Sequence, residues 1–319
     1  MSTQLPIEKQ VLPKEQPITP DQLHTEKMGL LYGFIGVLSF SLTLPVTKMV
    51  VTVLSPLSAG LGRALIAAVL AALVLLLKRV PFPTWQETKK LFLVSAGVVA
   101  GFPFFSSWAM ERVPATHGAV IIALLPLATA GAAIFFSGER PTRKYWISSV
   151  IACVTILACV TILAYAISSG FGALQWADLA LLGAVISAAI GYAVGGELSK
   201  TMGGWQVISW SLIFAFPFLV VPLTGPLLTD LKQATWPVWL GFGYISVISM
   251  FLGFFAWYHG LAIGGVSKVS QIQYLQPFLS IIAAWLLLSE PLTIGAVLSA
   301  VIVVLAVAKG RKASVQQKA

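Results

Sequence analysis

Polar side chains gather on one face of an otherwise apolar stretch near residues 270–280, which holds three glutamines and two serines. Amide and hydroxyl groups can hydrogen-bond a small polar molecule, and they are costly to expose to lipid. At 100° per residue along a helix, the residues that cover or extend this face are Ser270, Gln271, Gln273, Tyr274, Gln276, Pro277 and Ser280. We predict that Gln273, Gln276, Tyr274 and Pro277 bind a substrate. The alternative is that the amides hold neighbouring helices together.

Three residues elsewhere in the chain are candidates for the same site. Arg63 lies about two turns inside an apolar segment, where a charge costs about 2.5–3.5 kcal/mol, so it needs a substrate or a structural partner. Trp108 ends an aromatic group at residues 104–108, which forms either a wall for an apolar substrate or a belt at the membrane surface. Tyr192 lies within a later apolar segment. We include all three in the predicted binding site.

Residues for metal, nucleophilic or nucleotide chemistry do not form a recognisable pattern. The three histidines are far apart, without cysteine or carboxylate at ligand spacing. Cys153 and Cys159 lie in one apolar run, where packing is their expected role. There is no glycine-rich phosphate loop, which excludes direct ATP-driven pumping by this chain. We therefore expect neither a metal nor another cofactor.

The elements that carry these residues are apolar segments long enough to cross a membrane. Hydrophobic residues make up 58% of the 319-residue chain and charged residues 10%, with a mean hydropathy of +0.91. This composition excludes a soluble enzyme as a description of the whole chain. Ten segments have about the twenty residues that a spanning helix needs. Their approximate ranges are 28–51, 56–77, 89–110, 115–137, 144–167, 176–199, 205–224, 236–261, 268–289 and 292–309.

Lys and Arg are distributed unevenly between the two sides of these segments. With ten spans both chain ends lie on one side, and that side carries 16 of the 20 basic residues. Because basic residues are retained in the cytoplasm, we expect both termini to be cytoplasmic. The net charge of +9 is thus a topology signal, and no nucleic-acid partner is needed to explain it. Residues 1–27 are predicted to be a disordered tail, and residues 310–319 a basic tail.

The sequence overlays itself at an offset of 151 residues. Residues 115–142 and 266–293 align without gaps and share a proline within the segment, a pair of small residues, and then Glu and Thr where the segment ends. The matching positions are Pro126 and Pro277, Glu139 and Glu290, and Thr142 and Thr293. Each half then holds five spans. Because five is odd, we expect the two halves to be inverted relative to each other in the membrane.

The two units, which end in Gly-Glu-Arg-Pro-Thr and Ser-Glu-Pro-Leu-Thr, resemble the EamA domain. Two such domains in tandem are similar to the drug/metabolite transporter superfamily, and the likeness covers about residues 28–309. Arg63 also resembles the basic residue commonly found there in the first domain. The resemblance implies an all-α membrane fold with five-helix repeats at residues 28–167 and 176–309. It further implies an inner-membrane carrier that exports amino acids or other small metabolites through a cavity between the halves.

We therefore predict a secondary transporter that moves a small organic metabolite across the cytoplasmic membrane by alternating access, with no enzymatic activity. Its partners are the lipid bilayer and a small-molecule substrate, whose identity the sequence leaves open together with the oligomeric state. One alternative is a membrane enzyme acting on a lipid-linked substrate, but no nucleophile, acid–base pair or metal ligands converge at one depth. Another is a channel, which needs a continuous polar pore where only scattered polar patches are visible.

Overall fold

The computed structural model describes residues 20–143, 145–147, 149–151, 154, 175–223, 225–291 and 315–317. Within these residues, eight helices are long and apolar enough to cross a membrane. They are Leu23–Val50, Pro56–Leu77, Trp85–Arg112, Ala115–Phe136, Trp176–Met202, Gly204–Leu223, Trp236–Gly264 and Val266–Leu288. Each coincides with one of the ten predicted segments. The other two predicted segments, 144–167 and 292–309, lie largely or entirely outside the described residues.

Most of these long helices are divided into shorter elements. In the first half these are α1 (Pro20–Ser41), α2 (Thr43–Val50), α3 (Pro56–Leu77), α4 (Trp85–Val94), the π-helix η1 (Ser95–Gly101), α5 (Phe102–Arg112), α6 (Ala115–Ile122), α7 (Leu125–Phe136) and β1 (Glu139–Pro141). Their composition predicted that residues 20–27 belong to a disordered tail. This is wrong, because α1 begins at Pro20 and these residues are helical. Residues 1–19 lie outside the described part of the chain.

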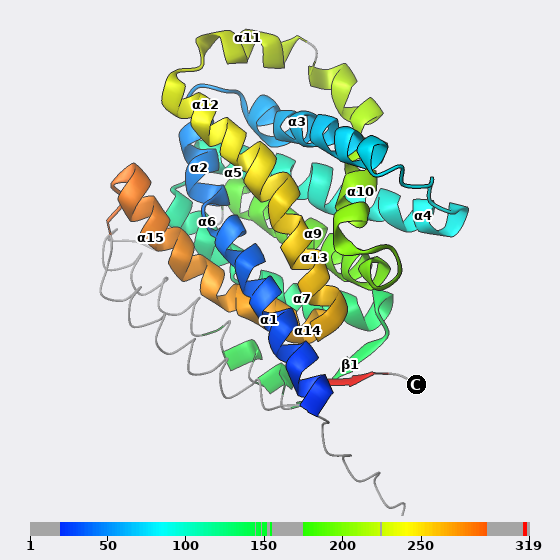
Figure 1. Ribbon diagram of the computed structural model, residues 1–319. Coiled ribbons are helices and arrows are strands. Elements are labelled where there is room, and N and C mark those ends of the chain that lie inside the picture. The colour runs from blue at the N-terminus through cyan, green and yellow to red at the C-terminus, as the bar shows by residue number, and fades with distance from the viewer. Residues whose placement is uncertain are drawn as a thin grey trace, which may run out of the picture.

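The second half is divided in a similar way. Its described elements are α9 (Trp176–Met202), α10 (Gly204–Leu223), α11 (Pro226–Gln233), α12 (Trp236–Gly243), the π-helix η2 (Tyr244–Leu252), α13 (Gly253–Gly264), α14 (Val266–Ser270), the 3₁₀-helix η3 (Gln271–Leu275), α15 (Gln276–Leu288) and β2 (Val315–Gln317). Figure 1 shows these helices packed side by side in one bundle, with α11 crossing one end and β1 and β2 paired near the other.

The irregular stretches recur at the 151-residue offset. The π-helix η1 falls on η2, and the turn at residues 123–124, between α6 and α7, falls on the end of η3. A serine explains part of this likeness. Ser95 donates its hydroxyl to the Leu91 carbonyl four residues earlier, and its equivalent Ser246 does the same to Phe242. Such side-chain bonds compete with the backbone ladder and distort a helix.

Close packing through glycine also occurs in both halves. A Cβ atom on Gly29 of α1 would lie 2.6 Å from the backbone of Gly264 in α13, so position 29 requires glycine. In the equivalent pair of helices, a Cβ atom on Gly97 of η1 would lie 2.5 Å from the Ser187 carbonyl of α9. These contacts let the first helix of each half lie directly against the third helix of the other half.

Two of the divided helices, α6–α7 and α14–η3–α15, cap each other at their ends. We call these two the broken helices. The Glu139 carboxylate, which follows α7, accepts bonds from the backbone N–H groups of Val266 (2.7 Å) and Ser267 (2.8 Å) at the start of α14. The Glu290 carboxylate, which follows α15, accepts bonds from Ala115 (2.9 Å) and Thr116 (3.0 Å) at the start of α6. At the 151-residue offset, Glu139 corresponds to Glu290, and Ala115 and Thr116 correspond to Val266 and Ser267. Because the end of each broken helix meets the start of the other, the two run antiparallel.

These carboxylates satisfy the free N–H groups at a helix start. From its position just before the next predicted segment, each glutamate would be expected to stabilise the start of the helix that directly follows it. In the structure the capped helix belongs to the other half of the chain, because the antiparallel arrangement brings that helix start to the glutamate.

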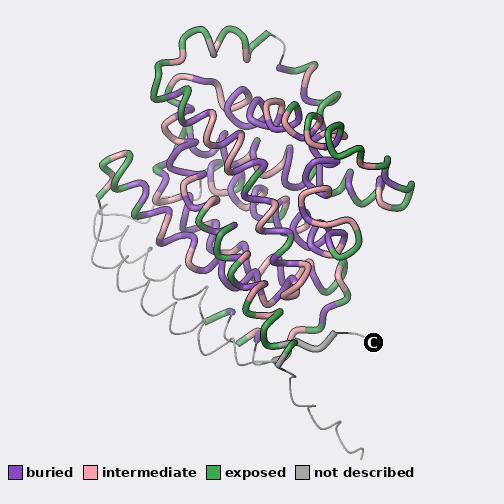
Figure 2. The backbone as a smooth tube through the Cα atoms, viewed as in Figure 1, coloured by how far each residue is buried: buried purple, intermediate pink, exposed green. Residues whose placement is uncertain are grey.

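The surface of the bundle is apolar where it would face lipid. Figure 2 shows buried residues along the inner sides of the helices and exposed residues on their outer sides and at the ends. Large apolar side chains with more than half of their surface exposed include Leu76, Phe135, Val221 and Leu286. An exposed apolar shell of this kind is the expected surface of a protein in a bilayer.

The short helix α11 lies outside the spanning segments and is tied to the start of α3. The Asp230 carboxylate accepts bonds from the Ser55 backbone N–H (2.9 Å) and hydroxyl (2.7 Å). Desolvation acts to raise the pKa of Asp230, but the bonds from Ser55 and Ser58 outweigh it and hold that pKa below its usual value. The charged form of Asp230 therefore fastens this loop to the bundle.

Candidate functional site

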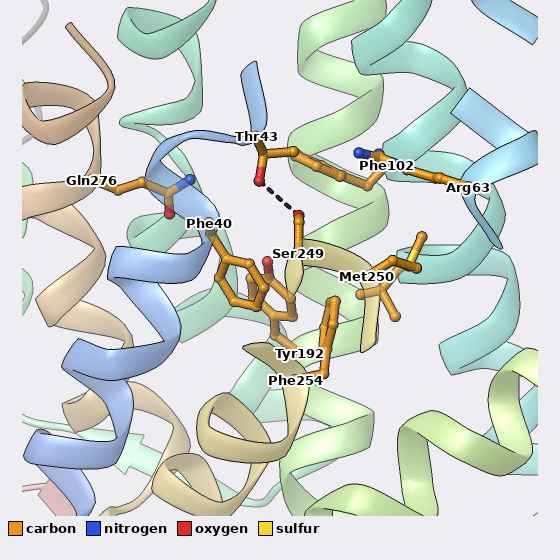
Figure 3. Close-up of a pocket in the computed structure, with 10 residues that line it drawn as sticks. Phe40, Thr43, Arg63, Phe102, Tyr192, Ser249, Met250, Phe254 and Gln276 are labelled. Atoms are coloured by element: carbon orange, nitrogen blue, oxygen red, sulfur yellow. Dashed lines mark hydrogen bonds between the residues drawn. The ribbon is translucent and has the colours of Figure 1, made fainter. Parts of the chain in front are cut away.

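A small cavity lies in the middle of the bundle, where both halves of the chain meet. Its volume is about 20 Å³, which is room for one water molecule. Residues of the first half supply Phe40, Thr43, Arg63, Val98 and Phe102, and residues of the second half supply Tyr192, Ser249, Met250, Phe254 and Gln276. Figure 3 shows Arg63 and Gln276 approaching from opposite sides, with Thr43 and Ser249 between them.

Breaks in the helices place the polar residues of this cavity. Thr43 is the first residue of α2, directly after the break that ends α1, and Gln276 is the first residue of α15, directly after η3. Ser249 lies in η2, and its repeat equivalent Val98 lies in η1. The hydroxyls of Thr43 and Ser249 are hydrogen-bonded at 2.7 Å. One direct polar bond thus joins the two halves across the cavity.

Arg63 brings a positive charge to this buried position. Its side chain extends from α3, and the residue is only 1% exposed. Among the described residues its Nε atom has no hydrogen-bond partner, and Tyr192 lines the same cavity. Arg63 and Tyr192, both predicted from the sequence, therefore lie together at the cavity.

The glutamines of the broken helix occupy different positions. Gln276 lines the cavity, and its Oε1 atom is buried without a hydrogen-bond partner in the described part of the chain. Gln273 lies near the Tyr192 hydroxyl but does not line the cavity, and neither atom of its amide makes a hydrogen bond of good geometry. Gln271 donates its amide to the Ser149 hydroxyl at 3.3 Å, which is a contact within the bundle. One of the three amides therefore lines the cavity, and another makes a hydrogen bond within the bundle.

The other predicted site residues lie away from the central cavity. Tyr274 is buried and donates its hydroxyl to the Ser149 carbonyl at 3.0 Å. Pro277 is buried in the first turn of α15 and is not among the residues that line the cavity. Trp108 lines a separate, open, apolar pocket of about 280 Å³, together with Phe104, Phe105, Trp176, Leu179 and Ala180. Its ring is also covered by the guanidinium of Arg112, 3.8 Å away.

Sequence reasoning missed most of the apolar lining of the cavity. The rings of Phe40 and Phe254 lie 5.0 Å apart between centroids, and the Tyr192 ring lies 6.0 Å from Phe254. Figure 3 shows these three rings grouped on one side of the cavity. Phenylalanine in a membrane helix carries no signal that separates a cavity wall from ordinary packing. Thr43 could have been found, because it lies two residues before Pro45, and a proline within an apolar segment marks a place where a helix is interrupted.

Each end of the bundle carries one glutamate cap and one close contact between a basic and an acidic side chain. We call the cap of α14 by Glu139, with the Lys268–Glu26 ion pair, the Glu139 end. The cap of α6 by Glu290, with the His117–Asp178 contact of 2.6 Å, is the Glu290 end. His117 and Lys268 occupy equivalent positions at the 151-residue offset. In both cases the base belongs to one half of the chain and its acidic partner to the other.

Within the described residues, no group of three or more histidine, cysteine, aspartate or glutamate side chains could hold a metal ion. The cavity presents one guanidinium, one amide, the hydroxyls of Thr43, Ser249 and Tyr192, and the rings of Phe40, Phe102, Tyr192 and Phe254.

Comparison with known proteins gives consistent results. The model of the EamA-like transporter family matches this chain twice, at residues 27–161 and 175–308. The uncharacterized transporter YdeK of Bacillus subtilis (strain 168) is 38% identical over 285 residues, which cover 89% of this chain and 97% of that protein. Protein PecM of Dickeya dadantii (strain 3937) is 24% identical over 254 residues, covering 77% of this chain and 81% of PecM. A crystal structure with 17% sequence identity superposes with a TM-score of 0.68 over 89% of this chain and 96% of that chain, which supports the fold.

Proposed function

This chain belongs to the EamA-like transporter family, and we propose that it is a secondary transporter that moves a small organic metabolite across the cytoplasmic membrane by alternating access. An amino acid or a related compound is the proposed substrate class, and export is the proposed direction. Both follow from the resemblance of the two repeats to exporters of small metabolites, and the transporter names of the relatives support transport in general.

The observation that carries this proposal is the closed cavity shared by the two halves. Arg63, Tyr192 and Gln276 are costly to bury unless they serve a ligand or a partner, and they meet at a point reached from both repeats. At about 20 Å³ the cavity is too small for an amino acid. Transport therefore requires the halves to separate around it, and the conformation described here is a closed one.

We further propose ten spans in two inverted five-helix repeats, at residues 28–167 and 176–309, with both termini in the cytoplasm. The antiparallel course of the two broken helices supports this arrangement, as do the π-helices that recur at the same offset. In this orientation the Glu139 end faces the cytoplasm and the Glu290 end faces the opposite side. The distribution of Lys and Arg supports the same assignment.

In the proposed mechanism the two glutamate caps act as alternate gates. In one step the backbone N–H groups of Val266 and Ser267 lose their bonds to Glu139, and α14 separates from β1. The cavity then opens at the Glu139 end, while the Glu290 cap stays closed. The reverse step opens the other end. Hydrogen bonds to a charged group each contribute about 1.5–3 kcal/mol. The free energy of one cap is thus comparable with the few kcal/mol that separate the conformations of a two-state protein. Binding of one substrate can therefore shift the equilibrium between the conformation open at the Glu139 end and the one open at the Glu290 end.

Counterflow in proteoliposomes tests the proposal. Vesicles containing the purified protein are loaded with one compound from a panel of amino acids and small metabolites, and entry of the same labelled compound is measured. A carrier exchanges its substrate, so uptake is accelerated by substrate on the far side and saturates. Chemical alteration of the compound, or an unsaturable conductance, would contradict the proposal and favour an enzyme or a channel.

A glutamine substitution tests the location of the site. Gln276→Leu removes the amide that faces the cavity, and we expect it to lower counterflow by roughly tenfold or more with normal insertion into the membrane. The control is Gln233→Leu, at an exposed position of α11. Equal counterflow in the two variants would remove Gln276 from the site.

A further inference from the structure

The central cavity contains a positive charge without a counterion among the described residues. We propose that the transported compound is a small organic acid or an amino acid with an uncharged side chain, and that its carboxylate pairs with Arg63. This inference rests on the proposed transport function and assigns a substrate class to its site.

The first support is a survey of the acidic residues. Nine of the eleven lie in the described part of the chain, and none of the nine forms an ion pair with Arg63. Four of them pair with other bases, in the pairs Glu26–Lys268, Glu111–Arg112, Asp178–His117 and Glu197–Lys200. Four others accept bonds from backbone or hydroxyl groups, and these are Glu87, Glu139, Asp230 and Glu290. Asp21 lies on the exposed first turn of α1.

The second support is the chemistry of a guanidinium in this position. Arginine keeps its charge under all ordinary conditions, so burial cannot neutralise it. A single buried charge is unfavourable unless it is paired and hydrogen-bonded. The planar guanidinium fits the two oxygens of a carboxylate with a pair of parallel hydrogen bonds. A carboxylate ligand would therefore supply a counterion for Arg63 and a hydrogen-bond acceptor for its Nε atom, which has no partner among the described residues.

The rest of the lining defines the remainder of the ligand. Phe40, Phe102, Tyr192 and Phe254 present rings, which favour an apolar or aromatic body. The free Oε1 atom of Gln276 can accept a hydrogen bond from the amino group of an amino acid. No acidic residue lines the cavity within the described part of the chain, so a purely cationic amine has no partner there and is repelled by Arg63.

Binding to the wild-type protein tests the proposal without any substitution. The purified protein is titrated in detergent with three matched sets: phenylacetate, phenylacetamide and phenethylamine; isovalerate, isovaleramide and isoamylamine; and phenylalanine with phenylalaninamide. Melting temperature and calorimetry report binding. We expect at least one acid or amino acid to bind, and its amide and amine to bind roughly thirtyfold more weakly or not at all. Binding of an amine or amide as tight as that of its acid, or the absence of binding by every acid, overturns the proposal. Equal stabilisation by chloride or phosphate shows a general anion site and also overturns it.

Substitution of Arg63 tests the residue. Arg63→Gln should weaken binding of that acid by roughly thirtyfold, and Arg63→Lys should retain part of it because the charge remains. Arg79→Gln, at an exposed position just beyond the end of the same helix, is the control and should bind normally. If Arg63→Gln does not fold, the comparison of Arg63→Lys with Arg79→Gln replaces it. Unchanged binding in the Arg63 variant overturns the assignment.

The outcome is separable from that of the transport test, because binding in detergent does not require exchange across a membrane. Binding of acids without counterflow would support the substrate class and contradict the transport proposal. Counterflow of an amine with no effect of Arg63→Gln would support transport and contradict the substrate class.

Discussion

The Glu139 end and the Glu290 end are built from equivalent residues but differ in how completely they are closed. Glu139 is 1% exposed, and its two bonds to α14 measure 2.7 and 2.8 Å. Glu290 is partly exposed, and its two bonds to α6 measure 2.9 and 3.0 Å. The Glu139 end is also covered by the pairing of β1 with β2, in which Glu139 lies opposite Gln317.

This difference shows which features of the two ends come from the shared repeat and which come from their surroundings. The backbone bonds made by the carboxylates are common to both ends. Among the described residues, β2 adds to the burial of the Glu139 end by pairing with β1. Tyr145 also donates its hydroxyl to the carbonyl of Ser267 at 2.6 Å, directly at the capped start of α14. We infer that the Glu139 end requires more free energy to open than the Glu290 end.

The largest effect is expected from Glu139→Gln. The amide has one acceptor oxygen where the carboxylate has two, so a buried backbone N–H of Val266 or Ser267 loses its partner. A buried unsatisfied N–H costs about 1–3 kcal/mol. Glu290→Gln should cost less, because water can replace the lost bond at a partly exposed site. Melting temperatures in detergent should therefore fall more for Glu139→Gln than for Glu290→Gln.

Glu197→Gln serves as the control for both variants. Its ion pair with Lys200 lies within α9, and both side chains are about a third exposed, so little stability should be lost. A drop for Glu290→Gln that equals or exceeds the drop for Glu139→Gln would contradict the inferred difference between the ends.

A smaller effect is expected from changing the residue that directly precedes each capped helix. Gly265 precedes α14 with a φ of +85°, and its repeat equivalent Pro114 precedes α6 with a φ of −60°. Gly265→Ala forces a side chain into a left-handed conformation, which costs about 1–2 kcal/mol. Pro114→Ala keeps an accessible conformation and should cost about 0.4–1 kcal/mol through the unfolded chain. Equal losses of melting temperature would show that the turn does not contribute to the difference.

The smallest effect concerns the contacts of Lys268 and His117. Lys268→Gln removes an ion pair whose side chains are 17% and 22% exposed, and His117→Gln removes the hydrogen bond to Asp178, where the two side chains are 42% and 14% exposed. Partly exposed pairs contribute about 0.2–1 kcal/mol, so both changes in melting temperature should be small and reduced further by salt. A larger loss from His117→Gln than from Lys268→Gln would reverse the order of the two ends.

Much of the fold could be predicted from the sequence, because lipid imposes one length and one composition on every spanning helix. The matching positions of Pro126 and Pro277 also indicated the repeat. The two helices that contain these prolines are both interrupted close to them. The reciprocal caps were not predictable. A sequence shows that Glu139 follows a helix, but only the antiparallel packing of the halves shows which helix start it meets.

The candidate site was predicted less well, for a geometric reason. The prediction for residues 270–280 assumed 100° per residue, but Gln271–Leu275 form a 3₁₀-helix, which turns about 120° per residue. Over five residues the difference reaches about 100°. Gln276 lines the cavity, whereas Tyr274 reaches the Ser149 carbonyl and Gln273 does not line the cavity. Trp108 lines the separate apolar pocket. Nothing in the sequence around Trp108 distinguishes a residue of that pocket from a residue of the central cavity.

The most direct test of the account measures access to the cavity from each side of the membrane. Thr43→Cys, in a protein whose Cys153 and Cys159 are replaced by alanine, places one thiol at the cavity, and a membrane-impermeant maleimide is applied to vesicles of either orientation. Alternating access through the two caps predicts that Glu139→Gln accelerates labelling from the cytoplasmic side and that Glu290→Gln accelerates labelling from the opposite side. Acceleration from the same side by both variants, or from both sides by either one, would contradict it.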